Sequence, residues 1–235
     1  MEFELQLKDL ETLDKKKESI KRVAASGDKV AMKELEIINC YYEHILSGKS
    51  ARSLTIPNDD VVLQLNLLTK KPVLYVCNVD EQSIQGNRYT DMVQESIVDE
   101  CADLLIISAS IESEINELDS IDDKMDFLEE MGLQEPGVNK VIQSAYSLLG
   151  LQTFFTAGEK EVRAWTIRKG ALAPQAAGVI HTDFEKGFIR AEVIAFEDRI
   201  KFKTEQACRE AGKISIEGKN YEVRDGDIMH FRFNV

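Results

Sequence analysis

The chain has 235 residues, 43% of them hydrophobic and 30% charged, which is the composition of a soluble globular protein with one large or two modest domains. No apolar run approaches the roughly 18–20 residues of a membrane-spanning helix. The first residues, "MEFELQLKDLETLDKK", contain no apolar signal core. We therefore expect a cytoplasmic protein with no membrane partner.

The cysteines and histidines argue against two further kinds of site. The four cysteines are scattered without a C-x-x-C pair, and the three histidines are widely spaced. The sequence therefore predicts neither a zinc site nor a disulfide framework. No nucleophile with an orienting base can be placed beside a histidine, so catalysis by such a pair is not expected.

Charge is unevenly distributed along the chain. Residues 151–235 carry 14 lysines and arginines against 13 aspartates and glutamates, whereas the preceding residues carry 15 against 29. An acidic protein does not bind nucleic acid through its overall field. RNA binding therefore requires a local basic patch on the near-neutral carboxyl-terminal part.

Two helices are predicted near the amino terminus, over residues 4–24 and 28–47, and Gly27 suits the turn between them. Such a pair of helices is typical of an antiparallel helical hairpin. After it, "PND" starts a short helix, with Asn58 expected as its N-cap. The apolar positions that form one stripe of the first helix are Leu10, Leu13, Ile20 and Val23.

The second helix ends in "ILSGKS", and Gly-Lys-Ser is also how the phosphate-binding loop G-x-x-x-x-G-K-[ST] ends. The loop needs a glycine five positions before Gly48, where this chain has Glu43, and the other two Gly-Lys pairs lack that glycine as well. The periodicity before Gly48 is helical, whereas the loop follows a strand. We therefore interpret Gly48 as a helix C-terminal cap with Lys49 in solvent.

The middle of the chain predicts a βαβ unit. The apolar runs at residues 71–79 and 103–110 indicate two buried parallel strands, and residues 89–102 between them have the pattern of an amphipathic helix. Further helices are expected within 111–131 and 137–149. This order of elements is typical of an α/β sheet.

From about residue 151 the pattern changes to short strands separated by glycine turns, which predicts a small α+β domain of about 85 residues. The expected strands are "TFFTAG", "EVRAWTIRKG", "FIRAEVIAF", "KISIEG" and "NYEVRDGDIMHFRFNV". The expected helices are "APQAAGVIH" and "TEQACREAG".

Polar residues follow both strands of the βαβ unit, where α/β sheets bind ligands. Asn78-Val79-Asp80-Glu81 stands where Ras-type GTPases have the N-K-x-D pattern that reads guanine, but here the fourth residue is Glu81. The longer side chain fits the paired donors of guanine poorly and so favours ATP over GTP. The second strand ends in Ser108-Ala109-Ser110, the position and residue types of the other base-contacting loop. The alternative is that both are ordinary loops after strands.

These loops and the carboxyl-terminal segments "TFFTAG", "KEVRAWTI", "IHTDFEKGFI" and "DGDIMHFRFNV" closely resemble the YchF / Obg-like ATPase family. The resemblance covers essentially the whole chain, and "LQLKDLETLDKK…SGKSARSL" resembles the helical hairpin inserted in that family's nucleotide domain. It implies a partial P-loop G-domain of α/β type with an inserted antiparallel helical hairpin, followed by a TGS domain of β-grasp (α+β) type. The implied boundaries are 1–70 for the hairpin, 71–149 for the G-domain part and 150–235 for the TGS domain.

The same resemblance implies function. Members of the family bind ATP, often in preference to GTP, with Mg2+, associate with ribosomes and are cytoplasmic. Carried over by position, Asn78, Val79 and Glu81 face the base, and the second base loop is Ser108-Ala109-Ser110.

The chain departs from the family by having no phosphate loop and no D-x-x-G magnesium motif, since no glycine has an aspartate three positions before it. Both are expected upstream of the hairpin, so the missing amino-terminal half of the G-domain is an expected partner. We expect this chain alone to hydrolyse nothing and to bind no cofactor strongly.

Two alternatives do not involve nucleotide. The first is a binding module in which the TGS-like domain contacts RNA or the ribosome, although the same residues also fit solvated strand faces. The second is a scaffold built on the hairpin. The cationic residues grouped in the TGS-like sequence are Arg163, Arg168, Lys169, Lys186 and Arg190.

Overall fold

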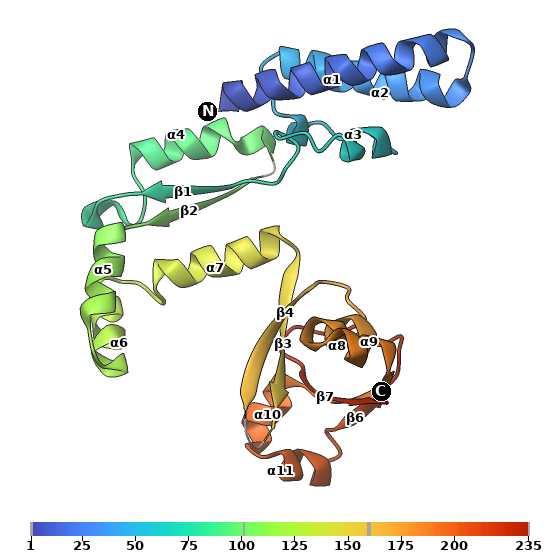
Figure 1. Ribbon diagram of the computed structural model, residues 1–235. Helices are drawn as coiled ribbons and strands as arrows, with labels where there is room; N and C mark the ends of the chain where they lie inside the picture. The colour runs from blue at the N-terminus through green and yellow to red at the C-terminus, as the bar shows by residue number, and fades with distance from the viewer. Residues whose placement is uncertain (1, 101, 159–160, 235) are drawn as a thin grey trace. The chain divides into compact units, whose positions relative to one another are not determined.

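Figure 1 shows the computed structural model of the chain, which describes residues 2–100, 102–158 and 161–234. The chain divides into two compact units, residues 1–141 and residues 142–235, and each is described by itself. No helix in the described ranges is long and apolar enough to cross a membrane. The division into three domains stays a prediction.

The first unit begins with two long helices that pack side by side, α1 (Glu2–Ala25) and α2 (Lys29–Leu46), here called the helical hairpin. Gly27 has a φ of 91° at the turn, a conformation that glycine adopts without steric cost. Asp28 then caps α2, because its carboxylate accepts hydrogen bonds from the N–H groups of two residues in the first turn. The core shared by the two helices includes Leu13, Ile20, Ile38, Tyr41 and Ile45.

The buried stripe of α1 differs from the sequence prediction. Val23 was expected in it but is 50% exposed, whereas Gln6 and Asp9 are buried. Asp9 is buried because its carboxylate accepts hydrogen bonds from the Leu68 and Thr69 N–H groups and from the Thr69 hydroxyl. Helical spacing cannot reveal this role, since the donors are about 60 residues away in sequence.

The hairpin is followed by the short helices η1 (Ala51–Ser53) and α3 (Asp60–Gln64). The prediction of Asn58 as N-cap is wrong, since Asp59 precedes the helix and Asn58 has a φ of 59°. The Asp59 side chain does not cap α3 either, because its carboxylate accepts hydrogen bonds from the Tyr41 hydroxyl and the Lys70 ammonium group.

The α/β part of the first unit contains two parallel strands, β1 (Leu74–Asn78) and β2 (Asp103–Ile107), with Leu74 opposite Asp103 and Asn78 opposite Ile107. The predicted parallel pairing is confirmed. The elements between the strands are η2 (Glu81–Ser83), α4 (Arg88–Ser96) and η3 (Val98–Glu100). After β2 follow α5 (Ala109–Glu117), α6 (Ile121–Glu130) and α7 (Gly137–Leu148).

The burial expected for these strands is only partly present. Val76 is 43% exposed, and the described residues of β2 are at best half-buried. The reason is that each strand of a two-stranded sheet has one unpaired edge, so fewer neighbours cover its side chains.

The second unit contains a five-stranded sheet in the order β4-β3-β7-β5-β6. β3 and β7 are parallel and pair at Phe155 and Ile228, and the other neighbouring strands are antiparallel. The strands are β3 (Leu151–Ala157), β4 (Val162–Arg168), β5 (Phe188–Ile194), β6 (Ser215–Glu217) and β7 (Ile228–Phe233). The helices are α8 (Ala173–Ile180), α9 (Thr182–Lys186), α10 (Phe196–Phe202) and α11 (Glu205–Glu210).

One face of this sheet packs on α8, whose Ala173, Ala176 and Ala177 are fully buried in the core. We call this the helix face and the opposite side the second face. The two short helices α9 and α10 were not predicted. α10 begins where "IAF" was expected to continue a strand, and Phe196 turns aside to stack on Phe155, with ring centroids 5.9 Å apart. The strand residues that form the core of the helix face are Phe154, Ile167, Phe188, Ala191, Val193, Met229 and Phe231.

Candidate functional site

The carboxyl ends of β1 and β2 bring the two predicted base loops together. Asn78 is the last residue of β1, and its Oδ1 atom accepts a 3.0 Å hydrogen bond from the Ala109 N–H at the start of α5. The Val79 N–H donates to the Ile107 carbonyl oxygen at 2.9 Å. These two bonds tie the loop after β1 to the loop of residues 108–110.

The remaining polar groups of these loops differ in burial. Ser108 is 1% exposed, and its hydroxyl lies 2.9 Å from that of Ser110. Asn78 and Glu81 are exposed, and Glu81 opens η2. The Asn78 amide nitrogen and the Glu81 carboxylate thus offer a donor and an acceptor, which are the groups needed to bond the edge of a heterocyclic base.

A carboxylate beside these loops joins α5 to α7. Glu112 accepts hydrogen bonds from the Gly137 N–H at 2.6 Å and the Val138 N–H at 3.2 Å, the first two residues of α7. A Cβ atom at Gly137 would lie 2.9 Å from Glu112 Oε1 and 3.0 Å from Ile107 Cγ2, so a larger residue here would force these side chains to shift by a few tenths of an ångström. The end of β2, the first turn of α5 and the start of α7 therefore meet at one junction.

The Gly-Lys-Ser segment after α2 has a structural role. Gly48 has a φ of 86°, its N–H donates to the Ile45 carbonyl oxygen, and Lys49 is exposed, which confirms the predicted helix cap. Ser50 is buried, and its hydroxyl lies 2.8 Å from Glu2 Oε1 and 3.1 Å from Glu100 Oε1.

Arg52 is the centre of a buried ion cluster at the base of the helical hairpin. Its side chain is 6% exposed, and its guanidinium group donates to Glu100 Oε2 at 2.7 and 3.0 Å and to Glu2 Oε1 at 2.8 Å. The Tyr75 hydroxyl, from β1, donates to Glu100 Oε2 at 2.9 Å. The cluster of Glu2, Ser50, Arg52, Tyr75 and Glu100, here called the Arg52 cluster, therefore joins the hairpin to β1 and η3.

The Arg52 cluster shifts the pKa values of Glu100, Arg52 and Tyr75. Burial alone would raise the pKa of Glu100, but the hydrogen bonds from Arg52 and Tyr75 have the larger effect and hold that pKa below its usual value. Burial would lower the pKa of Arg52, and contact with Glu100 and Glu2 raises it by more. Burial, followed by the bond to Glu100, raises the pKa of Tyr75.

The loops at the strand ends fit the base of a nucleotide better than its phosphates or a metal ion. Their exposed groups can bond a base edge, whereas the Gly-Lys-Ser segment serves as a helix cap. In the part of the chain that the structure describes, no group of three or more His, Cys, Asp or Glu side chains could hold a metal ion.

The five cationic residues predicted for RNA contact do not form one patch, although all are exposed. Arg168 and Lys169 lie at the carboxyl end of β4, where Arg168 pairs with Leu151. The other three lie toward the opposite end of the sheet: Arg163 pairs with Thr156 on β3, Arg190 pairs with Arg232 on β7, and Lys186 ends α9 just before β5.

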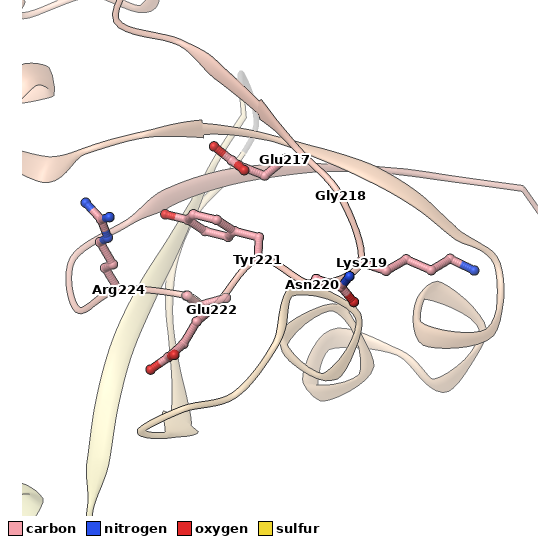
Figure 2. Close-up of a pocket in the computed structure, with 8 residues that line it drawn as sticks. Glu217, Gly218, Lys219, Asn220, Tyr221, Glu222 and Arg224 are labelled. Atoms are coloured by element: carbon pink, nitrogen blue, oxygen red, sulfur yellow. The ribbon is translucent and has the colours of Figure 1, made fainter.

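Figure 2 shows a hollow of about 660 Å³ in the second unit, lined by residues 217–224. Tyr221 and Arg224 extend to one side of it and Lys219 to the other. The Tyr221 hydroxyl donates to the buried Asp227 carboxylate at 2.7 Å, and burial, then this carboxylate, raises the pKa of Tyr221. Asp227 also accepts from the Arg224 N–H, so these groups stabilise the turn before β7.

Sequence reasoning missed Glu112 and the Arg52 cluster. For Glu112 the available signal was the Pro-Gly pair at residues 136–137, at which a helix starts. For Arg52 there was none, since its carboxylate partners are about 50 residues away in sequence.

Parallel strands flanked by helices, with polar loops at the strand carboxyl ends, define the α/β class that binds ligands at this edge. Residues 151–234 match the family model YchF-GTPase_C, described as a protein of unknown function (DUF933). The chain is 49% identical over 234 residues to the Ribosome-binding ATPase YchF of Haemophilus ducreyi, covering 99% of this chain and 64% of that protein. The YchF of Bacillus subtilis is 48% identical over 238 residues, with 99% and 65% covered.

Two solved structures are similar to this chain. The Schizosaccharomyces pombe YchF GTPase has a TM-score of 0.86 at 34% identity, covering 98% of this chain and 64% of that chain. A GTP binding protein from Pyrococcus horikoshii OT3 has a TM-score of 0.57 at 17% identity, with 99% and 70% covered, which shows a likeness of fold alone. This chain is thus a relative of the YchF proteins over nearly its whole length, and the predicted resemblance is confirmed. It spans 64% of the length of the Haemophilus ducreyi relative.

Proposed function

We propose that the chain supplies the base-recognition half of the nucleotide site of a cytoplasmic, ribosome-associated ATPase of YchF type. In this proposal residues 71–149 are part of a G-domain, the helical hairpin is an insertion in it, and residues 150–235 are a TGS domain. The names of the relatives, which describe ribosome-binding ATPases, support the proposal.

The observation that carries the proposal is the hydrogen bond between Asn78 Oδ1 and the Ala109 N–H. It uses the amide oxygen to hold the two loops together and leaves the amide nitrogen available to a ligand. The Ala109 and Ser110 backbone then lines one side of a base, and Val79 and Glu81 line the other.

Glu81 would select the base. Its carboxylate is one methylene longer than the aspartate that accepts both guanine donors in Ras-type sites, so it fits guanine poorly. ATP is therefore the expected ligand, and GTP is the weaker one. The names of the relatives differ in this respect: the Haemophilus ducreyi protein is called an ATPase, and the Schizosaccharomyces pombe structure is called a GTPase.

The phosphates and Mg2+ need residues other than those described. Base contacts alone amount to a few hydrogen bonds at about 1 kcal/mol net each, which corresponds to millimolar affinity or weaker. We propose that the phosphate loop and the magnesium ligands belong to the part of such proteins with which this chain does not align. Mg2+, when bound there, would neutralise charge on the phosphates.

Binding of labelled ATP and GTP with Mg2+ tests the proposal. We compare this chain with a chimera that adds the unaligned segment of the Haemophilus ducreyi relative. The chimera should bind ATP and the chain alone should not. In the chimera, Glu81→Asp should raise GTP affinity relative to ATP, and an unchanged ratio would remove Glu81 from base selection. Tight ATP binding by the chain alone would contradict the division of the site.

A second candidate function is a binding module that contacts RNA or the ribosome without nucleotide. The exposed cationic residues of the second unit favour it, and three of them lie toward one end of the sheet. This function predicts ribosome binding by the full chain that weakens as salt rises, with or without ATP. No binding at low salt would contradict it.

A further inference from the structure

The second unit has a hollow of about 790 Å³ where the core of the helix face opens at one end of the sheet. β3 and β7 pair only at Phe155 and Ile228, and beyond this pair both strands border the hollow. The last residues of α8 and the middle of α9 complete its wall through Ile180 and Phe184.

Aromatic rings dominate the lining of this hollow. Phe184 and Phe233 stack with ring centroids 3.8 Å apart, and Phe233 keeps 36% of its surface exposed. Trp165 is half-buried, and its indole N–H donates to the Thr156 hydroxyl at 2.9 Å, which fixes the orientation of its ring. The hollow is thus an opening with preoriented aromatic surfaces and a polar edge.

Cationic groups lie beside this opening. The Arg163 guanidinium lies 4.2 Å from the Trp165 ring centroid, and Lys186 follows Phe184 by two residues. Arg190 pairs with Arg232, and because side chains alternate along a strand, both project from the second face and not from the face of the hollow. The opposing charges are Glu161, which also lines the hollow, and Asp183 and Glu185, which flank Phe184 on α9.

We propose that this hollow binds an unpaired base of single-stranded RNA. The base stacks on the aromatic lining next to Phe233 and Trp165, and the phosphates on either side of it contact Arg163 and Lys186. Stacking surfaces next to positive charge are the combination that binds single strands. The inference rests on the second candidate function and specifies the kind of RNA that it requires.

A paired base does not fit this arrangement. In a duplex both faces of each base are already stacked on neighbours, so the hollow can receive only a base that has left the stack. The Thr156 hydroxyl at the edge of the hollow offers a hydrogen bond to such a base without selecting one sequence. The site should therefore prefer single strands over duplexes with little dependence on sequence.

The test uses Trp165 as a reporter, because the chain contains a single tryptophan. A mixed-sequence 12-nucleotide single-stranded RNA is titrated into the full chain at low salt, with a 12-base-pair RNA duplex as the comparison. Trp165 fluorescence and the anisotropy of labelled RNA are followed together. The single strand should quench Trp165 as it binds, and the duplex should not.

Two substitutions separate stacking from charge. Phe233→Leu keeps the volume and removes the stacking surface, so single-strand affinity should fall about 5- to 150-fold. Arg163→Gln should lower the slope of log affinity against log salt by about 0.7. Arg224→Gln is the matched control, since Arg224 is an exposed arginine in the turn before β7, away from this hollow, and should change neither quantity.

Three results would overturn the inference: RNA binding without quenching of Trp165, equal quenching by the duplex, or full affinity in Phe233→Leu. Each of them leaves the second candidate function intact if the chain still binds ribosomes in a salt-dependent way. Loss of ribosome binding together with normal quenching by single-stranded RNA would instead contradict that function and keep the site.

Discussion

β1 has polar groups near both of its ends, and the two sets are used differently. Near the amino end, Tyr75 belongs to the Arg52 cluster, whose guanidinium group is buried and whose donors and acceptors are paired within the chain. At the carboxyl end, Asn78 gives its oxygen to Ala109, and Glu81 stays exposed. Paired, buried polar groups stabilise a fold. Exposed groups held in place by a neighbouring bond are available to a ligand.

The same comparison bears on how strongly a short sequence motif indicates a binding site. Gly48-Lys49-Ser50 is the better-known pattern, but its glycine caps a helix and its serine belongs to the Arg52 cluster. The four residues from Asn78 to Glu81 form a weaker pattern, yet they lie at the strand end where α/β proteins bind ligands. The Gly-Lys-Ser resemblance therefore belongs to a structural segment, and the base loop at residues 78–81 stays a prediction.

Arg52→Ala should have the largest effect, because it leaves the Glu100 and Glu2 carboxylates without their partner. Breaking a buried ion pair costs about 3–5 kcal/mol, and we expect about 3 kcal/mol because the Glu2 side chain is 39% exposed. Urea unfolding followed by far-ultraviolet circular dichroism measures the loss.

The fluorescence of Trp165 provides the control for this experiment, since Trp165 lies in the second unit. The dichroism transition of Arg52→Ala should shift to lower urea, whereas the fluorescence transition should not. Lys49→Ala, at an exposed neighbouring position, should shift neither. A loss below about 1 kcal/mol in Arg52→Ala would show that the cluster is not a paired, buried unit.

Acid should reduce the stability of the first unit by a smaller amount. The pKa of Glu100 is lower in the folded chain than its ordinary value of 4.5. This carboxylate therefore stabilises the folded state above pH 4.5, and the contribution is lost as the pH falls through the lowered pKa. The urea midpoint of the first unit should therefore decrease as the pH is lowered from 6 to 3.

Glu100→Gln is the matched variant for the acid effect, because it keeps the shape of the side chain and removes its titration. Its urea midpoints should be lower at pH 6 and should depend less on pH than those of the parent. Equal pH dependence in the two proteins would mean that other groups, such as Asp59, whose pKa is lowered by Tyr41 and Lys70, dominate acid unfolding.

Asn78→Ala should have the smallest effect on stability, about 0.5–1 kcal/mol, because the lost hydrogen bond joins exposed positions. Its local effect is larger: without the amide oxygen, the Ala109 N–H should exchange with solvent faster. Amide hydrogen exchange measured by NMR reads this directly. Asp80→Ala is the control, since the Asp80 side chain makes no capping bond, and unchanged exchange of Ala109 in Asn78→Ala would disprove the tie between the loops.

The sequence predicted those parts of the fold that depend on local pattern. Periodicity indicated the helices around Gly27, and two apolar runs indicated the parallel pairing of β1 with β2. Contacts between distant residues were not predictable in this way. The burial of Asp9 and of Arg52 depends on partners about 50 to 60 residues away, and nothing in the spacing of either segment specifies them.

The candidate sites show the same limit. The loops after β1 and β2 were found because strand ends can be read from hydrophobic runs, but their mutual bond required coordinates. The cationic residues were grouped by sequence, and the strand register then separated Arg168 from Arg163 by the length of β4. The aromatic hollow was not foreseen, since Trp165, Phe184 and Phe233 lie on three different elements.

The Arg52 cluster has a mechanical consequence. It joins the start of α1 and the segment after α2 to η3, and α1 has 24 residues, so the hairpin extends about 36 Å from this support. A rotation of about 10° at the support would displace the far turn by about 6 Å, by the geometry of a helix of that length. A small change of geometry at Arg52 is therefore amplified at Gly27. The buried ion pairs thus determine the direction of the helical hairpin as much as its stability.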